Sequence, residues 1–282
     1  MNILTFDIEE WFHLLDNEST KTSKEWKNYE VRIHQNMERI LTFLKETNQK
    51  ATFFCLGWIA ETYPEVIREI VDRGYEIGSH GRMHQLVYEQ STAEFANDLE
   101  YSIKTLEDIS GQKVKYFRAP GFSIGEQNKW AFEIIAAQGI EVDCSVFPAT
   151  RTHGGFPNFK QPVPCRLRYQ GIELKEFPIS YHTVMGKPVI FTGGGYFRIF
   201  PYPLIRKWTE ESEYIMSYFH PRDFDAQQPV IRGLSMWRRY KTYVGLSSSN
   251  QKLKNWITDF RFTDIGTAKE TIHWGNVPMV EI

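Results

Sequence analysis

The sequence predicts an α/β protein in which parallel strands are joined by helical crossovers. Short apolar runs, beginning with residues 3–6, alternate with segments in which apolar residues recur at helical spacing, beginning with residues 31–44. A closed barrel or an open, doubly wound sheet satisfies such alternation. In both architectures the C-terminal ends of the strands share one mouth, where we expect the functional residues.

Each predicted element has a local signal. The polar turn Thr47-Asn48-Gln49 separates the first helix from the next strand, and Gly74 and Gly139 end later helices. The predicted strands cover residues 3–6, 51–56, 75–79, 115–118, 140–144, 173–179, 189–192 and 214–219, and the predicted helices cover residues 31–44, 64–71, 92–109, 129–137 and 204–209.

We expect one domain over residues 1–282. Residues 150–170 are rich in Pro, Gly and Arg and are predicted to form a long loop over the mouth rather than a linker between domains. Residues 263–282 are expected to be a C-terminal extension of this domain.

The charge balance limits the possible partners. The chain has 33 basic and 35 acidic residues and a formal net charge of −2, so it has no overall positive charge with which to bind nucleic acid or an anionic membrane. No run of eighteen apolar residues suggests a membrane span. The first residues, MNILTFDIEEWF, lack the pattern of a signal peptide, and the three cysteines form no CxxC pair. These features predict a cytoplasmic, reducing location.

Two histidines four residues apart, His80 and His84, follow the third predicted strand. On a helical turn their imidazoles can face the same way, as metal chelation requires. Among eight histidines such a pair arises by chance with a probability of roughly 0.2, so the spacing alone is weak evidence. The position of the pair directly after a strand strengthens the interpretation.

Acidic residues follow the first predicted strand. Asp7 and Glu9 project to the same side if the extended geometry continues beyond the strand. A carboxylate from this segment can join the two histidines. Two imidazoles and one carboxylate, with open positions for water and substrate, form the ligand set of a hydrolytic metal site.

Three further polar residues lie at predicted strand ends. Arg118 precedes a turn made by Pro120 and Gly121, and its guanidinium can pair with a carboxylate. Asp143 and His220 each lie at the end of a predicted strand, and an Asp–His pair would raise the pKa of the imidazole and orient it as a general acid.

Taken together, these segments resemble the polysaccharide deacetylase family, also called the NodB-homology domain or carbohydrate esterase family 4. The matching motifs are TFDIE, SHGRMH, RAPG, VDCS and YFHP, and they occur in the order of the family's motifs. The stretches ATFFCLGWIAETYPE and GGGYFRIFP look more like the subgroup associated with bacterial exopolysaccharide loci. The resemblance runs from residue 3 to about residue 262 and implies a distorted barrel of about seven parallel strands.

The resemblance implies a role for each candidate residue. Asp7 would be the catalytic base held by Arg118, and His220 would be the general acid tuned by Asp143. One divalent metal ion, expected to be Zn²⁺, would bind to Glu9, His80 and His84. Independently of the resemblance, we expect the backbone N–H of Gly121 to help to hold the oxyanion. The aromatic content also offers rings that can stack on a sugar, although any single ring is more often part of the core; the candidates are Trp11, Tyr196, Trp58 and Trp237.

The first motif departs from the family pattern. The family has two adjacent aspartates, whereas here Ile8 intervenes and a glutamate supplies the second carboxylate. The carboxylate ligand could therefore be Asp7, Glu9 or Glu10. Gly81 stands where the family usually has Ser or Thr, so a hydroxyl beside the metal ligands is lost.

The implied activity is metal-dependent hydrolysis of the acetamide of N-acetylated sugars, in a polysaccharide or in its lipid-linked precursor. One alternative is a catalytically inactive carbohydrate-binding protein on the same fold, since fold does not dictate function. Another is an amidohydrolase for a small non-sugar amide. The N-acetylated carbohydrate is the expected partner, and the sequence indicates no oligomeric state.

Overall fold

The protein is built around one eight-stranded sheet. The structure, a computed structural model, describes residues 1–15, 17–20, 22–231 and 233–282. Its strands are β1 (Asn2–Ile3), β2 (Thr5–Ile8), β3 (Thr52–Cys55), β4 (Glu76–Ser79), β5 (Tyr116–Phe117), β6 (Val142–Asp143), β7 (Cys165–Tyr169), β8 (Ile172–Glu176), β9 (His182–Val184), β10 (Lys187–Val189), β11 (Ile215–Met216) and β12 (Met279–Glu281). The large sheet has the order β12-β7-β8-β6-β5-β4-β3-β2, while β1 pairs with β11 and β9 with β10.

Neighbouring strands of the large sheet are parallel, except that β7 and β8 form an antiparallel hairpin. The wall of the barrel continues beyond β2. Strand β1 pairs in parallel with β11, and Phe6 of β2 forms a parallel bridge with Phe219. This bridge brings the segment that ends at His220 beside the strand that delivers Asp7. The predicted fold class, a distorted α/β barrel of mainly parallel strands, is confirmed.

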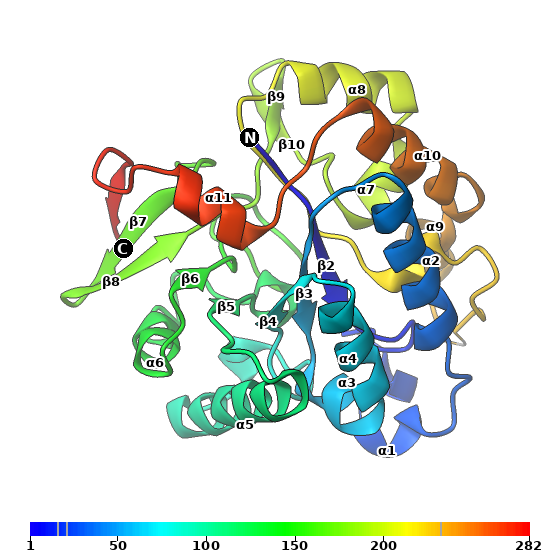
Figure 1. The fold of residues 1–282 in the computed structure, drawn as a ribbon, viewed down its shortest axis with the longest axis horizontal. Helices are drawn as coiled ribbons and strands as arrows, with labels where there is room; N and C mark the ends of the chain where they lie inside the picture. Colours follow the sequence, from blue (N-terminus) through cyan, green and yellow to red (C-terminus); the bar gives the residue numbers. More distant parts are fainter. Residues whose placement is uncertain (16, 21, 232) are drawn as a thin grey trace.

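Helices cover the outside of the sheet (Figure 1). They are α1 (Ser23–Trp26), α2 (Ile33–Glu46), α3 (Gly57–Thr62), α4 (Pro64–Asp72), α5 (Thr92–Ser110), α6 (Ala131–Ala137), α7 (Gly194–Ile199), α8 (Tyr202–Glu210), α9 (Met236–Tyr243), α10 (Leu246–Asp259) and α11 (Ile265–Thr271). Four short 3-10 helices, η1 (Glu18–Thr20), η2 (Val87–Glu89), η3 (Pro120–Phe122) and η4 (Pro221–Phe224), lie in the described connections. None of the helices within the described ranges is both long and apolar enough to cross a bilayer.

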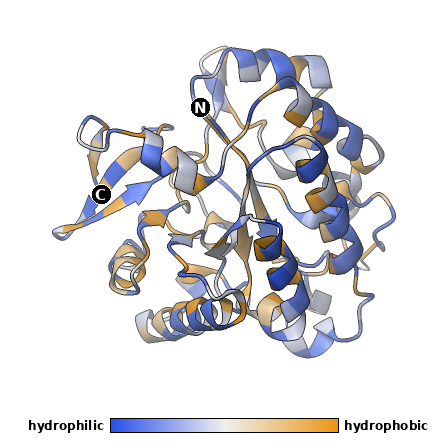
Figure 2. Ribbon diagram, in the orientation of Figure 1, coloured by the Kyte–Doolittle hydropathy of each residue, from blue (hydrophilic) through white to orange (hydrophobic). Residues whose placement is uncertain are grey.

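Helix α5 illustrates how the sequence fixes an element. Ser91 and Glu94 form a reciprocal capping box at its start, and Gly111 ends it in a left-handed conformation at φ 67°. Its buried residues Phe95, Leu99 and Leu106 recur at helical spacing and pack into the core. Figure 2 shows the same division in other helices, with apolar residues toward the sheet and polar residues outward.

The predicted elements in the first half of the chain are present in the structure, which adds the unpredicted helices α1 and α3 there, and the second half differs more. The predicted loop 150–170 ends earlier, because residues 165–169 form β7 and pair with β8. Of the predicted strand 189–192 only Val189 lies in a strand, at the end of the β9–β10 hairpin, and the predicted strand 214–219 has only two residues in a regular ladder. Residues 246–259, for which no element was predicted, form helix α10, and the extension 263–282 contains α11 and the edge strand β12.

The remaining loop, residues 144–164, lies against the turn that follows β5. Gly155 donates its N–H to the carbonyl of Phe122, and the guanidinium of Arg151 lies 4.9 Å from the ring of Phe122. Gly154 and Gly155 also line a cleft of about 310 Å³ together with Ser123 and residues 125–128. The loop therefore packs beside the turn that follows β5, at the C-terminal ends of the strands, where it was predicted to lie. That the loop belongs to one domain, and is not a linker between two, stays a prediction.

Candidate metal and catalytic site

Three side chains from two strand ends converge on a potential metal position. Glu9 follows β2, while His80 and His84 follow β4, and one ligand atom from each lies within 4.8 Å of the others. The Oε1 atom of Glu9 is 3.3 Å from Nε2 of His84 and 3.8 Å from Nε2 of His80. All three residues are buried. This is the only such group among the described residues, and it matches the predicted ligand set.

The two histidines are presented by an irregular loop and not by the predicted helical turn. Gly81 adopts φ 74° and His84 φ 53°, both in the left-handed region. The loop is fixed from α5, because Asp98 accepts the N–H of Arg82 at 2.7 Å. A Cβ at Gly81 would lie 3.0 Å from the carboxylate of Asp98, so glycine suits this position for both conformation and space.

The hydrogen bonds around His80 fit a metal ligand. Its Nδ1 atom lies 2.7 Å from the carbonyl oxygen of Arg118, which can only accept a hydrogen bond. The proton of the neutral ring therefore sits on Nδ1 and leaves the Nε2 lone pair free, which is the usual arrangement for a metal-binding histidine. Burial raises the pKa of Glu9, but His84 and His220 outweigh burial and bring that pKa well below its usual value. The donor set thus fits a divalent ion such as Zn²⁺.

Asp7 lies beside this group but is held by Arg118. The Nη1 atom of Arg118 donates to Oδ1 of Asp7 and to Oγ1 of Thr5, each at 2.7 Å. The arginine is fully buried and lies 4.3 Å from the ring of Phe54. This pairing is the one predicted, and it fixes one carboxylate oxygen of Asp7 while Oδ2 faces His220 at 3.9 Å.

His220 faces both carboxylates of the first motif. Its Nε2 atom is 3.2 Å from Oε1 of Glu9, and its Nδ1 atom is 3.0 Å from Oδ2 of Asp223. Burial lowers the pKa of His220, but Glu9 and Asp223 outweigh burial and raise the pKa to about 10. A quarter of the side chain is exposed, so the charged imidazole is accessible from the mouth.

The prediction that Asp143 tunes His220 is wrong, because Asp223 occupies that place. Asp143 accepts hydrogen bonds from the N–H and the hydroxyl of Ser145 at 2.9 and 2.7 Å and pairs in register with Glu176 of β8. Burial raises the pKa of both Asp143 and Glu176. Asp143 is therefore part of a buried polar cluster between strands and not the partner of the imidazole.

Asp223 was not among the predicted site residues, although it lies three residues after His220. Its Oδ2 atom accepts from Nδ1 and from the backbone N–H of His220, the latter at 2.9 Å, and Arg198 of α7 lies 3.3 Å from Oδ1. Burial raises the pKa of Asp223, but His220 and Arg198 outweigh it and bring the pKa to about 2. The available signal was the sequence HPRD, in which Pro at the first position of a short helix favours a turn that carries the carboxylate back.

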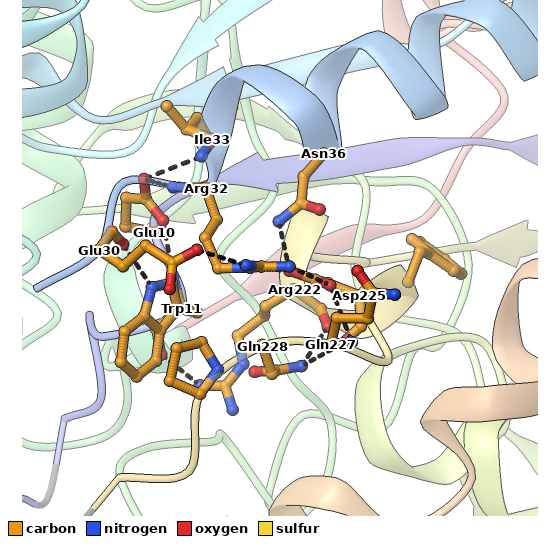
Figure 3. Close-up of polar contacts among 12 residues, drawn as sticks. Glu10, Trp11, Glu30, Arg32, Ile33, Asn36, Arg222, Asp225, Gln227 and Gln228 are labelled. Carbon is orange, nitrogen blue, oxygen red and sulfur yellow. Dashed lines mark hydrogen bonds and ion pairs between the residues drawn. The ribbon is translucent and has the colours of Figure 1, made fainter.

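Glu10 has a structural role (Figure 3). Its Oε1 atom accepts the N–H groups of Arg32 and Ile33 at 2.7 and 2.8 Å, and so satisfies the free donors at the start of α2. Beside it Arg32 pairs with Asp225 through Nε at 2.5 Å. Of the three acidic candidates in the first motif, Glu9 alone belongs to the possible metal group found in the described chain.

The predicted substrate contacts have different outcomes. Trp11 is only 3% exposed, its ring packs in a hydrophobic cluster, and its indole N–H donates to the carbonyl of Glu30. A ring buried in this way cannot stack on a sugar, so the prediction of a sugar platform at Trp11 is wrong. Tyr196 of α7 is half exposed, and its role stays a prediction. Gly121 adopts φ 62° in η3, and a Cβ there would lie 2.8 Å from Leu15, which explains the glycine. The contact of its N–H with an oxyanion also stays a prediction.

A further histidine, His13, lies next to the metal ligands. Its ring centroid is 6.0 Å from that of His84, and its Nδ1 atom accepts the N–H of Glu10 at 3.3 Å. Burial lowers the pKa of His13 well below its usual value, and the neighbouring His84 acts in the same direction. The neutral ring carries its proton on Nε2, for which the described residues offer no partner. No spacing rule singled out this residue from the sequence.

Two family models match the chain in succession. Residues 4–142 match the family described as polysaccharide deacetylase, and residues 144–270 match a domain of unknown function, DUF3473. The boundary falls between β6 and β7, yet β6 pairs with β8, so the two matched regions share one sheet.

Curated relatives match over a limited region. The chain is 35% identical over 96 residues to a peptidoglycan-N-acetylglucosamine deacetylase of Bacillus cereus, which is 34% of this chain and 35% of that protein. It is 35% identical over 77 residues to chitin deacetylase 1 of Saccharomyces cerevisiae, which is 27% of this chain and 26% of that protein. The matches thus span about a third or less of these relatives.

Solved structures share the fold over nearly the whole chain. A protein from Mycobacterium smegmatis assigned to the polysaccharide deacetylases superposes with a TM-score of 0.66 at 18% identity, covering 99% of this chain and 92% of that one. A CE4 family pseudoenzyme from Bacillus anthracis superposes with a TM-score of 0.51 at 14% identity, covering 94% and 64%. Residues 4–142 therefore carry a polysaccharide deacetylase domain, and the solved structures show that the same fold extends over nearly the whole chain.

Proposed function

We propose that the protein is a metal-dependent N-deacetylase that hydrolyses the acetamide of an N-acetylated sugar, in a polysaccharide or in its lipid-linked precursor. The observation that carries the proposal is the convergence of three groups at one edge of the sheet. These are the possible metal ligands Glu9, His80 and His84, the pair Asp7–Arg118 and the pair His220–Asp223. The relatives named as deacetylases of peptidoglycan and chitin support this substrate class.

Glu9, His80 and His84 would hold one divalent ion, and we propose Zn²⁺. When bound, such an ion supplies Lewis acidity toward a carbonyl oxygen and lowers the pKa of water to about 7. The Nε2 lone pair of His80 and the ionised carboxylate of Glu9 suit this task without rearrangement of protons.

The other two pairs divide the proton transfers between them. Asp7 accepts a proton from the attacking water, while Arg118 holds its carboxylate in position. His220 starts as an imidazolium, because its pKa is raised to about 10, and donates a proton to the departing amine. Acetate and a free amino sugar result.

The alternative of an inactive carbohydrate-binding protein predicts that at least one of these parts is missing or misplaced. Here the residues proposed for these roles, Asp7, His220 and the ligand Glu9, each lie within hydrogen-bond or ion-pair distance of a partner, which supports an active enzyme. The alternative of a small non-sugar amide keeps the same chemistry and differs only in the substrate.

The test is the release of acetate and of free amine from N-acetylglucosamine oligomers, measured together on the wild type and on His220→Ala. We expect equal amounts of both products from the wild type and a loss of roughly 10² to 10⁴-fold in the variant. The Glu10→Gln variant is the matched control, because Glu10 lies outside the metal group. Activity on a small acetamide but not on any oligomer would favour the non-sugar alternative, and no release from either would favour the inactive one.

A further inference from the structure

The net charge of −2 conceals an uneven distribution of charge along the chain. Residues 226–258 contain six basic residues and no acidic residue, so the rest of the chain carries a net charge of −8. Binding to an anionic surface depends on local charge rather than on the total. The expectation that the chain lacks positive charge for such a surface therefore does not hold for this segment.

Helix α9 (Met236–Tyr243) lies within this basic segment and presents apolar side chains to solvent. None of its residues is buried, and Met236, Trp237 and Tyr240 are 90%, 65% and 54% exposed. The three residues are spaced so that they share one side of a helix. The rings of Trp237 and Tyr240 lie nearly parallel, with centroids 5.9 Å apart. Large exposed apolar groups gathered in this way mark an interaction surface.

Basic residues flank the exposed rings. Arg239 and Lys241 are exposed, and Nζ of Lys241 lies 4.9 Å from the centre of the Trp237 ring. Helices that lie in the plane of a membrane interface combine these features, with Trp and other apolar groups on one face and Lys or Arg beside them. Tyr and Trp favour the headgroup level, and Lys and Arg are attracted to anionic lipids.

We propose that α9 is a membrane-contacting helix that lies in the headgroup region of an anionic phospholipid bilayer. The helix is capped at its start and bonded to the body of the protein at its end. Ser235 accepts the N–H of Arg238 at 3.3 Å at its start, and Arg198 donates to the carbonyls of Thr242 and Val244 at 2.8 and 3.1 Å at its end. Because α9 is bonded to α7 through Arg198, its contact with a bilayer would bring this side of the protein to the membrane.

The same arginine connects α9 to the candidate site. Arg198 pairs with Asp223 at 3.3 Å, and Asp223 holds His220. A bilayer bound by α9 would therefore lie close to the mouth of the site, which suits a sugar that is attached to a lipid. This last step rests on the proposed function, whereas membrane binding by α9 does not.

Co-sedimentation of the full chain with vesicles tests the proposal without any measurement of turnover. We expect binding to phosphatidylcholine vesicles that contain phosphatidylglycerol, little binding to phosphatidylcholine alone, and weaker binding as salt is added. The double variant Trp237→Ala/Tyr240→Ala should lose binding by about tenfold or more. Arg239→Gln/Lys241→Gln should lose about tenfold or more and show a smaller salt dependence.

Matched controls come from other faces of the molecule. Lys45→Gln/Lys104→Gln removes two charges from α2 and α5, and Met185→Ser removes an apolar side chain that is 97% exposed in the β9–β10 hairpin. Both controls should bind vesicles like the wild type. The proposal is overturned if the wild type does not bind anionic vesicles, or if the α9 variants bind like the controls. Binding of soluble alginate, an acidic polysaccharide, without binding of vesicles would assign the surface to a glycan and also overturn it.

Discussion

Asp223 holds His220 through two hydrogen bonds to one oxygen, from the ring Nδ1 atom at 3.0 Å and from the backbone N–H at 2.9 Å. The carboxylate thereby fixes both the orientation of the imidazole and its charge. Arg198 lies on the other carboxylate oxygen at 3.3 Å, so the acid is supported by a chain of charges that reaches α7.

Asp223→Asn should lower turnover at neutral and alkaline pH and move the alkaline limb of the pH profile to lower pH. The reason is that the carboxylate of Asp223 helps to raise the pKa of His220, and an amide gives no such stabilisation to the imidazolium. A shift of about one pH unit or more is expected from the loss of one adjacent opposite charge. Steady-state profiles of the variant and the wild type on one oligomer measure this shift.

Asp143→Asn is the control for this experiment. Its side chain bonds to Ser145 and lies beside Glu176, whereas the imidazole of His220 bonds to Asp223. We expect it to change stability while the alkaline limb stays in place. A limb that moves in Asp143→Asn and not in Asp223→Asn would contradict the assignment.

Glu9→Gln and Glu10→Gln should differ in their effects, because the first should lose the metal ion and the second should keep it but be less stable. Glu9 is the carboxylate of the possible metal group, so its amide variant, like His80→Ala, should purify without the ion. Glu10 accepts two N–H groups at the start of α2, so its variant should keep the ion and unfold at a lower temperature. Elemental analysis and thermal unfolding check the pair, and equal metal loss in both variants would refute the distinction.

Asp7→Asn should retain the metal ion and lose turnover by roughly 10² to 10⁴-fold, because the amide cannot accept a proton from water. It should also destabilise the protein, since the buried guanidinium of Arg118 loses its ion pair at 2.7 Å. Metal content, turnover and unfolding temperature are measured on the same preparation. Retention of near-normal turnover would show that another group is the base.

Glu76 should contribute stability that falls as the pH rises from about 4.3 to about 7, and Glu76→Gln should remove this contribution. Burial raises the pKa of Glu76 to about 7, whereas the unfolded chain has a value of about 4.3. The folded state therefore binds this proton more tightly, and its contribution is present at low pH and lost as the pH rises through about 7. Thermal unfolding at several pH values compares the two proteins, and identical slopes would rule out this contribution of Glu76.

The sequence predicted the parts of the fold whose signals are local. The strands before residue 144 are apolar runs bounded by turn residues, and residues 92–110 carry their own capping box and stop signal. The hairpin of β7 and β8 was missed in part, because residues 165–169 follow a stretch rich in Pro and Gly and contain three charged or polar side chains. The edge strand β12 could not be inferred, since its pairing with β7 joins segments more than a hundred residues apart.

The candidate site was predictable where its residues lie at the ends of strands that the sequence identifies. Glu9, His80, His84 and the pair Asp7–Arg118 come together because parallel strands end at the same edge. The partner of His220 was misassigned, because both Asp143 and Asp223 lie near strand ends and only the turn of η4 decides between them. Trp11 was misassigned because its burial depends on the packing of distant loops.

The most direct test of the account is a titration of metal-free protein with Zn²⁺, in which bound metal and the rate of acetate release from N-acetylglucosamine oligomers are measured on the same samples. We predict that the rate rises in proportion to occupancy and stops rising at one ion per chain. His220→Ala should bind the ion equally well while its rate stays near the background. A rate that is independent of metal occupancy, or an unimpaired His220→Ala, would contradict the account.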